Sequence, residues 1–296
     1  MDKALIIKII ILVILIVIAG CILEFWRYLR FKYWDMKPNI TSRSSYKKET
    51  RIVITMTTIP ERINKMHPTI ASLLDQSIKA DEIALNLPWK TRKGKSYDIP
   101  KWLSEIKEVK IYRVNEDEGP ATKLLPTLRR ETNPDTKILV VDDDVIYNSK
   151  TLEKLLKVHD KRKCAVTQYG IVLQPDGSLP STYSRVEGFF TYSRKVDLLQ
   201  GFSGFLVTPS MFPKEVYALK HGPKEAISVD DIWFSGWLAY NNIDIYTPHC
   251  TFLNLPIASW GDIRTTPALG KTENVGMVRD QKVINWFINE KGIWKK

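Results

Sequence analysis

Residues 137–147 constrain this chain most, because a short apolar run passes there directly into three carboxylates. Residues 138–141 are apolar without alternation, which predicts a strand buried on both faces of a parallel sheet. Asp142, Asp143 and Asp144 follow at once. Three like charges repel one another unless a cation lies among them, and carboxylate oxygens suit Mg²⁺ or Mn²⁺. Because ligands of open α/β sheets bind at the carboxyl ends of strands, this position predicts a cation site, with a solvated acidic turn as the alternative.

Strand and helix patterns alternate from Arg51 onward. Short apolar, largely β-branched runs at residues 52–56, 82–87 and 109–114 predict three strands ahead of the acidic one. Between the first two of these strands, apolar residues recur at helical spacing over residues 63–74. The alternation predicts an α/β fold with a mostly parallel, Rossmann-like sheet and helices on both faces.

The pattern continues after the acidic run. We expect a helix over 149–161 with Ser149 as its N-cap, a strand pair within 164–172, and a strand over 201–207. We further expect a helix capped by Ser228 or Asp230, a strand over 243–246 and a closing amphipathic helix over 277–290. No glycine-rich phosphate loop of the dinucleotide or P-loop kind occurs. A bound nucleotide would therefore need another partner for its phosphates, such as a metal on the carboxylates.

The N-terminus has the composition of a membrane segment. Residues 5–23 are apolar apart from Lys8, long enough to cross the roughly 30 Å hydrocarbon layer as a helix. The length of this run and the lack of a small-residue cleavage site favour a single-pass signal anchor over a cleaved signal peptide. We therefore divide the chain into an anchor (1–30), a stem (31–50) with a sequon at Asn39, and a globular domain (51–296).

The orientation in the membrane stays open. Basic residues follow the span at least as densely as they precede it, which by the positive-inside rule favours a cytosolic domain. In a eukaryote, we nevertheless expect the domain behind such a signal anchor to lie in the Golgi or ER lumen. The net charge of +11 favours an anionic partner, but the Lys and Arg residues are spread along the chain, which argues against nucleic acid. Cys164 and Cys250 either form one disulfide or stay free.

The ordered set of motifs resembles the GT-A glycosyltransferases. It consists of the anchor, the Asp142-x-Asp144 motif ending a strand, Asp230-Asp231 at a helix start, and His249 after the next strand. The resemblance covers about residues 51–255. It implies a metal-dependent glycosyltransferase that moves a sugar from a nucleotide-sugar donor, most simply a UDP-sugar, to a hydroxyl of a glycan, glycoprotein or glycolipid acceptor, with Mn²⁺ or Mg²⁺ as cofactor.

The same resemblance implies roles for individual residues. The implied metal ligands are Asp142, Asp144 and His249. The implied catalytic carboxylates are Asp231, as the general base that takes the acceptor proton, and its neighbour Asp230. The implied nucleotide-sugar contacts are Thr57, Arg62, Asn86, Lys123, Asp142 and Asp143. Trp233, Trp237 and Trp260 either stack on acceptor sugars or belong to the core, and residues 258–270 resemble a lid.

Two other functions compete with this one. A phosphatase of the haloacid-dehalogenase type also has an Asp-x-Asp after a strand and a late Asp pair. Its acidic strand usually opens the core domain, whereas three predicted strands come first here, and Ile146 stands where that family has Thr or Val. The third reading is a membrane-anchored sugar- or nucleotide-binding protein without catalysis.

Overall fold

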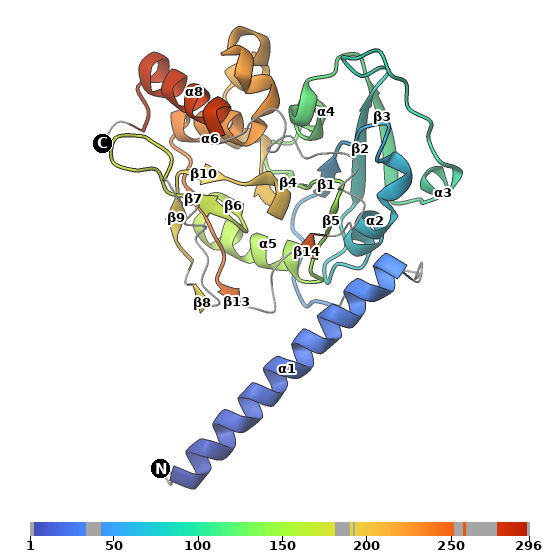
Figure 1. The fold of residues 1–296 in the computed structure, drawn as a ribbon, viewed down its shortest axis with the longest axis vertical. Helices are drawn as coiled ribbons and strands as arrows, with labels where there is room; N and C mark the ends of the chain where they lie inside the picture. The colour runs from blue at the N-terminus through green and yellow to red at the C-terminus, as the bar shows by residue number, and fades with distance from the viewer. Residues whose placement is uncertain are drawn as a thin grey trace.

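A computed structural model describes residues 3–33, 43–180, 190–191, 193–251, 257–258 and 277–294. Its centre is an eight-stranded sheet in the order β3-β2-β1-β4-β11-β6-β12-β9 (Figure 1). These strands are β1 (Ile52–Met56), β2 (Glu82–Pro88), β3 (Val109–Val114), β4 (Lys137–Val140), β6 (Ala165–Thr167), β9 (Lys195–Val196), β11 (Phe205–Val207) and β12 (Ile245–Tyr246). Strands β1 to β4 are parallel, and β12 is parallel to β6, whereas β11 and β9 run antiparallel to their neighbours. The predicted α/β fold with a mostly parallel sheet is confirmed.

Short two-stranded pairs surround the large sheet. They are β5 (Val145–Ile146) with β14 (Ile257–Ala258), β7 (Gly170–Ile171) with β10 (Leu198–Leu199), and β8 (Phe190–Thr191) with β13 (Cys250–Thr251). The expected strand pair within residues 164–172 is therefore wrong. Its two parts, β6 and β7, bond to different neighbours instead of to each other, because β6 is taken into the large sheet between β11 and β12.

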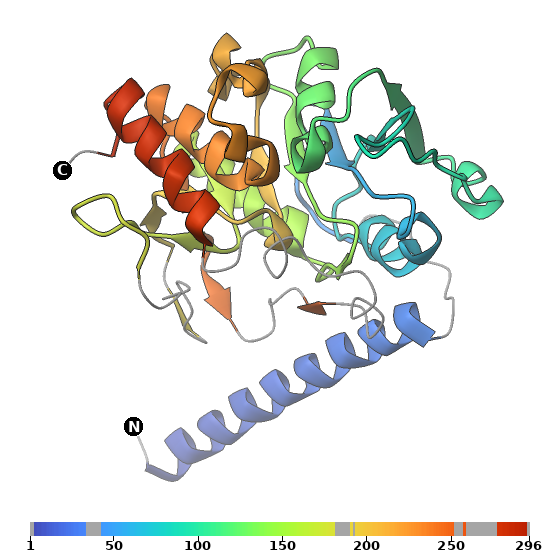
Figure 2. The same cartoon turned by 45° about the horizontal axis from the view of Figure 1, so that its top comes forward.

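The side chains of β4, the apolar strand before the three carboxylates, alternate between two hydrophobic clusters, one on each face of the sheet. Ile138 and Val140 point into one hydrophobic cluster, and Leu139 and Val141 into the other, as the two-residue period of a strand requires. The first cluster is covered by α4 (Leu125–Arg130), α6 (Asp230–Tyr240) and α8 (Val278–Trp286), which ends in a π-helical turn, η11 (Phe287–Lys291). Figure 2 shows α8 lying beside α6. The second is covered by α2 (His67–Leu74), α5 (Thr151–Arg162) and α3 (Lys101–Ser104). The sheet is thus buried on both faces, as predicted.

Several expected boundaries are corrected by local chemistry. The helix predicted over 63–74 is a 3₁₀ turn, η1 (Ile63–Lys65), followed by α2, because Pro68 fits only the first turn of a helix. Helix α5 begins at Thr151, so Ser149 is not its N-cap; Asn148 Oδ1 accepts the Lys150 N–H at 2.9 Å instead.

The regions around Gly201 and Asp230 also differ from expectation. Residues 201–203 form a 3₁₀ turn, η3 (Gly201–Ser203), and the strand starts only at Phe205. Val229 occupies the N-cap position of α6, so neither Ser228 nor Asp230 caps that helix. Asp230 is already helical, and its side chain is therefore available for other contacts.

The N-terminal segment forms one long helix, α1 (Lys3–Tyr33), which projects from the domain and meets it near α2 and β5 (Figure 1). It is the one helix among the described residues that is long and apolar enough to cross a membrane. The sequon at Asn39 lies outside the described residues. Cys164 is a buried free thiol, so of the two alternatives for this residue the structure has the unpaired one.

Candidate functional site

Residues 142–144, the aspartate turn, follow directly on β4 and are fixed through their backbone. The Asp142 N–H donates to the Tyr147 hydroxyl at 2.9 Å, and the Thr69 hydroxyl donates to the Asp143 carbonyl at 2.9 Å. Asp143 is buried, whereas Asp142 and Asp144 are partly exposed. The alternation along the turn therefore presents the first and third carboxylates outward, as a strand-like period of two predicts.

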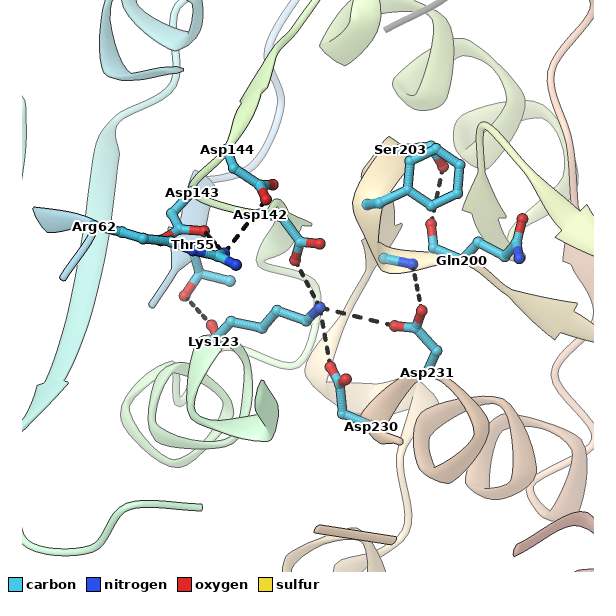
Figure 3. Close-up of polar contacts among 12 residues, drawn as sticks. Thr55, Arg62, Lys123, Asp142, Asp143, Asp144, Gln200, Ser203, Asp230 and Asp231 are labelled. Carbon is cyan, nitrogen blue, oxygen red and sulfur yellow. Dashed lines mark hydrogen bonds and ion pairs between the residues drawn. The ribbon is translucent and has the colours of Figure 1, made fainter. Parts of the chain in front are cut away.

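Arg62 is the counter-ion of the aspartate turn. Its Nη1 lies 3.0 Å from Asp143 Oδ1 and 3.3 Å from Asp144 Oδ2 (Figure 3). The Thr58 hydroxyl donates to the second oxygen of Asp143. Burial raises the pKa of Asp143, and Arg62 opposes that shift. Burial, Asp143 and Asp142 together raise the pKa of Asp144 to about 7. The turn therefore carries more negative charge than one guanidinium balances.

Lys123 connects the aspartate turn to the start of α6. It ends the turn η2 (Gly119–Lys123), and its Nζ lies 2.9 Å from Asp142 Oδ1, 3.0 Å from Asp230 Oδ2 and 3.8 Å from Asp231 Oδ1 (Figure 3). Burial alone lowers the pKa of Lys123, but the three carboxylates outweigh burial and raise it well above its usual value. Lys123 is thus a permanently charged, buried cation that joins two motifs far apart in the sequence.

Asp230 and Asp231, the helix-start pair, differ in their access to solvent. The Asp231 side chain is 32% exposed and the Asp230 side chain 8%. The Gly201 N–H donates to Asp231 Oδ2 at 2.8 Å, which orients this carboxylate. Burial, followed by the neighbouring Asp230, raises the pKa of Asp231 to about 8. Asp231 is therefore the member of the pair that a solute can reach.

Gly201 is required by this packing. A Cβ on this residue would lie 2.5 Å from Asp231 Oδ1 and 2.6 Å from Lys123 Nζ, closer than real Cβ atoms approach. A glycine in a predicted strand often marks close approach of another group, and at Gly201 the groups that approach are the Asp231 carboxylate and the Lys123 ammonium.

The charge balance of the site fits a divalent cation. Five carboxylates face two cations, Arg62 and Lys123, over the contacts described above. Among the described residues, no group of three or more His, Cys, Asp or Glu side chains is arranged as a metal cluster. Mg²⁺ commonly takes only one or two carboxylates and completes its shell with water and substrate phosphates. Asp142 and Asp144, both partly exposed, meet that requirement.

Hydrogen bonds link two of the other predicted residues, Thr57 and Asn86, to Lys123. The Thr57 hydroxyl donates to the Asn86 carbonyl at 2.7 Å. Asn86 is fully buried, and its amide donates to the hydroxyls of Thr55 and Thr127, each at 3.0 Å. Thr55 also donates to the Lys123 carbonyl at 2.6 Å, so Asn86 helps to fix the backbone of Lys123 through Thr55. His249 lies exposed in the segment between β12 and β13, and its role as a metal ligand stays a prediction.

The tryptophans of α6 belong to the core. Trp233 and Trp237 are buried and pack edge-to-face with each other, and both rings also pack against Trp286 and Phe287. Of the two alternatives for these rings, the core is therefore confirmed and stacking on an acceptor sugar is wrong. Trp260 and nearly all of the predicted lid lie outside the described residues.

Tyr147 is the residue that sequence analysis missed. It is fully buried, its hydroxyl accepts from the Asp142 N–H, and it donates to the Phe202 carbonyl at 3.2 Å. It thus ties the aspartate turn to the turn that carries Gly201. A tyrosine at the end of an apolar strand gave the only signal, since a buried hydroxyl needs partners.

No protein-family model and no curated protein matches the chain. Among solved structures, the chain is similar to GalNAc-T7 with UDP, GalNAc and Mn²⁺, at 11% identity and a TM-score of 0.48, covering 72% of this chain and 46% of that one. It is also similar to S. aureus TarS 1–349 in complex with UDP, at 16% identity and a TM-score of 0.43, covering 68% of this chain and 58% of that one. The chain thus spans about half the length of these structures.

Proposed function

We propose that this chain is a metal-dependent glycosyltransferase that moves a sugar from a nucleotide sugar, most simply a UDP-sugar, to a hydroxyl of a glycan or glycoconjugate. One observation carries the proposal: the Lys123 ammonium holds Asp142 of the aspartate turn beside Asp230 and Asp231 of α6. The aspartate turn, whose carboxylates can bind a cation, and the solvent-accessible carboxylate of Asp231 thereby lie in one site. This is the combination that transfer from a charged donor to a hydroxyl needs.

The donor side consists of Arg62 and the aspartate turn. Asp142 and Asp144 would hold Mn²⁺ or Mg²⁺, which when bound offsets the charge that develops on the leaving nucleoside diphosphate. Arg62, with a 22% exposed side chain, is placed to bind phosphate oxygens as well as Asp144. Asp143 supports this side through its contact with Arg62, and Asn86, whose carbonyl accepts from Thr57, bonds to the Lys123 carbonyl.

The acceptor side consists of Gly201 and the helix-start pair. The acceptor oxygen attacks the anomeric carbon while its proton passes to Asp231, and the bond from that carbon to the diphosphate breaks with its electron pair leaving on the diphosphate. A pKa raised to about 8 makes Asp231 a stronger base than an ordinary carboxylate, with a value suited to general-base work near neutral pH. The Gly201 N–H donates to Oδ2 and orients the carboxylate, while Oδ1 is buried 3.8 Å from Lys123 Nζ. A direct displacement of this kind inverts the anomeric configuration.

We further propose that α1 anchors the domain to a membrane as a single-pass helix. Its described apolar side chains from Leu5 to Ile16, with Ile18, Ile22 and Leu23, are exposed, so nothing in the described domain covers them. Which side of the membrane holds the domain is a separate question that protease protection in sealed vesicles answers.

A donor screen tests the proposed function. The purified chain is incubated with UDP-, GDP- and CMP-sugars, with and without Mn²⁺, and release of the nucleotide is measured. We expect slow hydrolysis of one donor that requires the metal. Phosphate release from p-nitrophenyl phosphate without any sugar-nucleotide turnover would indicate the phosphatase, and donor binding without turnover of either substrate would indicate a binding protein.

A further inference from the structure

The last turns of α1 bury side chains on the domain, unlike the rest of this helix. Arg27 has a 12% exposed side chain, and Phe31 is 5% exposed. Phe31 packs against Ala71 of α2 and Ile146 of β5, with the Arg27 guanidinium 4.8 Å from its ring centre. An anchor that only tethers a domain needs no such contact. This contact joins the end of α1 to α2 and β5, the elements next to the aspartate turn.

Arg27 bonds to three acceptors from two elements. Its Nε lies 2.6 Å from Asp75 Oδ2, its Nη1 donates to the Tyr147 carbonyl at 2.7 Å, and its Nη2 donates to the Ser72 carbonyl at 3.2 Å. Ser72 and Asp75 belong to the end of α2, and Tyr147 follows β5. A planar guanidinium with a fixed fork of donors can join these groups, and an ammonium cannot satisfy all of them at once.

Tyr147 carries this contact onward to the aspartate turn. Its N–H donates to the Ser72 hydroxyl at 3.0 Å, and its own hydroxyl accepts from the Asp142 N–H. The same hydroxyl reaches the Phe202 carbonyl, next to Gly201. On the α2 side, Thr69 donates to the Asp143 carbonyl. Arg27 therefore clamps together the two elements that fix the backbone of residues 142–144.

We propose that the last turns of α1 are part of the scaffold of the active site, with Arg27 as a positioning residue that fixes the aspartate turn through Tyr147. This inference rests on the proposed function, because it assigns Arg27 an effect on metal and nucleotide binding. The helix that anchors the domain to the membrane then also supports the active site. A second link inside the domain, from Gln76 Nε2 to the carbonyls of Ser72 and Asn148, keeps the fold together when Arg27 is lost.

Binding of UDP to the full chain in detergent, measured by calorimetry with and without Mn²⁺, tests the inference. We expect Arg27→Ala to weaken Mn²⁺-dependent UDP binding at least tenfold, and Arg27→Lys to fall between this variant and the unaltered chain. Arg43→Ala removes the other cation on Asp75 but leaves the Tyr147 carbonyl bonded, so it should cost less. Lys32→Ala is the matched control, because the contacts of Lys32 among the described residues lie within its own helix.

Hydrogen exchange of the metal-free chain gives a second readout. In Arg27→Ala, amides of residues 142–147 should exchange faster, while those of β2 stay as slow as before. UDP affinity equal to that of the unaltered chain overturns the inference, and so does faster exchange throughout the sheet, which signals general destabilisation. Should Arg27→Ala fail to fold, Arg27→Lys decides by the same measures. If the unaltered chain binds no UDP with Mn²⁺, the proposed function fails, and the exchange experiment still judges whether Arg27 fixes the turn.

Discussion

The aspartate turn and the helix-start pair are both acidic, but their counter-ions differ in kind. Arg62, which serves the turn, has a 22% exposed side chain and lies at the site's edge. Lys123, which contacts both members of the pair as well as Asp142 of the turn, has a 6% exposed side chain and lies among these three carboxylates. A cation near solvent can exchange partners with a ligand, whereas a buried one stays where it is, because moving it leaves unpaired charge behind. Arg62 on the donor side can therefore exchange a carboxylate for a ligand, whereas Lys123 on the acceptor side keeps its carboxylate partners.

Removing the buried cation should have the largest effect. Lys123→Met leaves Asp142, Asp230 and Asp231 without their shared partner, and loss of one partner of a buried ion pair costs about 3–5 kcal/mol of unfolding free energy. Arg62→Met, at the more exposed position, should cost clearly less. Urea unfolding of both variants checks the comparison. Equal losses would show that the two counter-ions are equivalent.

The next largest effect concerns the chemical step. Asp231→Asn keeps the size of the side chain but removes the base, so transfer should slow by at least about 100-fold while donor affinity stays nearly unchanged. Asp230→Asn is the control, because this carboxylate is buried against Lys123 and should affect stability more than rate. Transfer rates beside calorimetric donor affinity separate the two. Normal transfer by Asp231→Asn with an inactive Asp230→Asn would reverse the roles.

Within the aspartate turn, the first and third carboxylates should matter for the metal and the second for the fold. Asp144→Ala should lower Mn²⁺-dependent donor binding by more than about 100-fold, since losing a ligand exceeds the 10–100-fold cost of losing a supporting partner. Asp143→Asn keeps a group that Thr58 and Arg62 can contact, and its effect should be milder. Chelation with EDTA should reduce donor binding of the unaltered chain to the level of Asp144→Ala. Equal sensitivity at both positions would argue against this division.

The smallest effect is expected from removing the anchor. Residues 47–296 should fold without detergent, because every strand of the large sheet and both hydrophobic clusters that cover it lie beyond residue 50. The truncation removes Arg27 and Arg43, two cations that contact Asp75, so we expect a loss of about 1.5–3 kcal/mol, the usual contribution of a hydrogen bond to a charged group. Thermal unfolding followed by circular dichroism measures it. A molten or insoluble product would show that α1 is needed for folding itself.

Local patterns in the sequence predicted most of the fold. The apolar run before the three carboxylates became β4, and the three strands ahead of it fell within a residue of expectation. Short-range rules failed where another element competed. Lys150, whose N–H is bonded by Asn148, holds the N-cap position of α5 in place of Ser149, and the Gly201 N–H bonds to Asp231 in the turn that residues 201–203 form in place of a strand.

What the sequence alone determined is the set of charges and where along the chain each follows a buried strand or opens a helix. Hydrophobic periodicity is a local property, and it fixes strands, faces and the end of the sheet at which polar groups gather. Only the tertiary structure decided which charges share a partner. Lys123 lies between carboxylates about 20 and 110 residues further along the chain, and Arg27 of the anchor reaches Tyr147 across 120 residues. Such pairings depend on how packed layers bring distant turns together, and no local pattern records them.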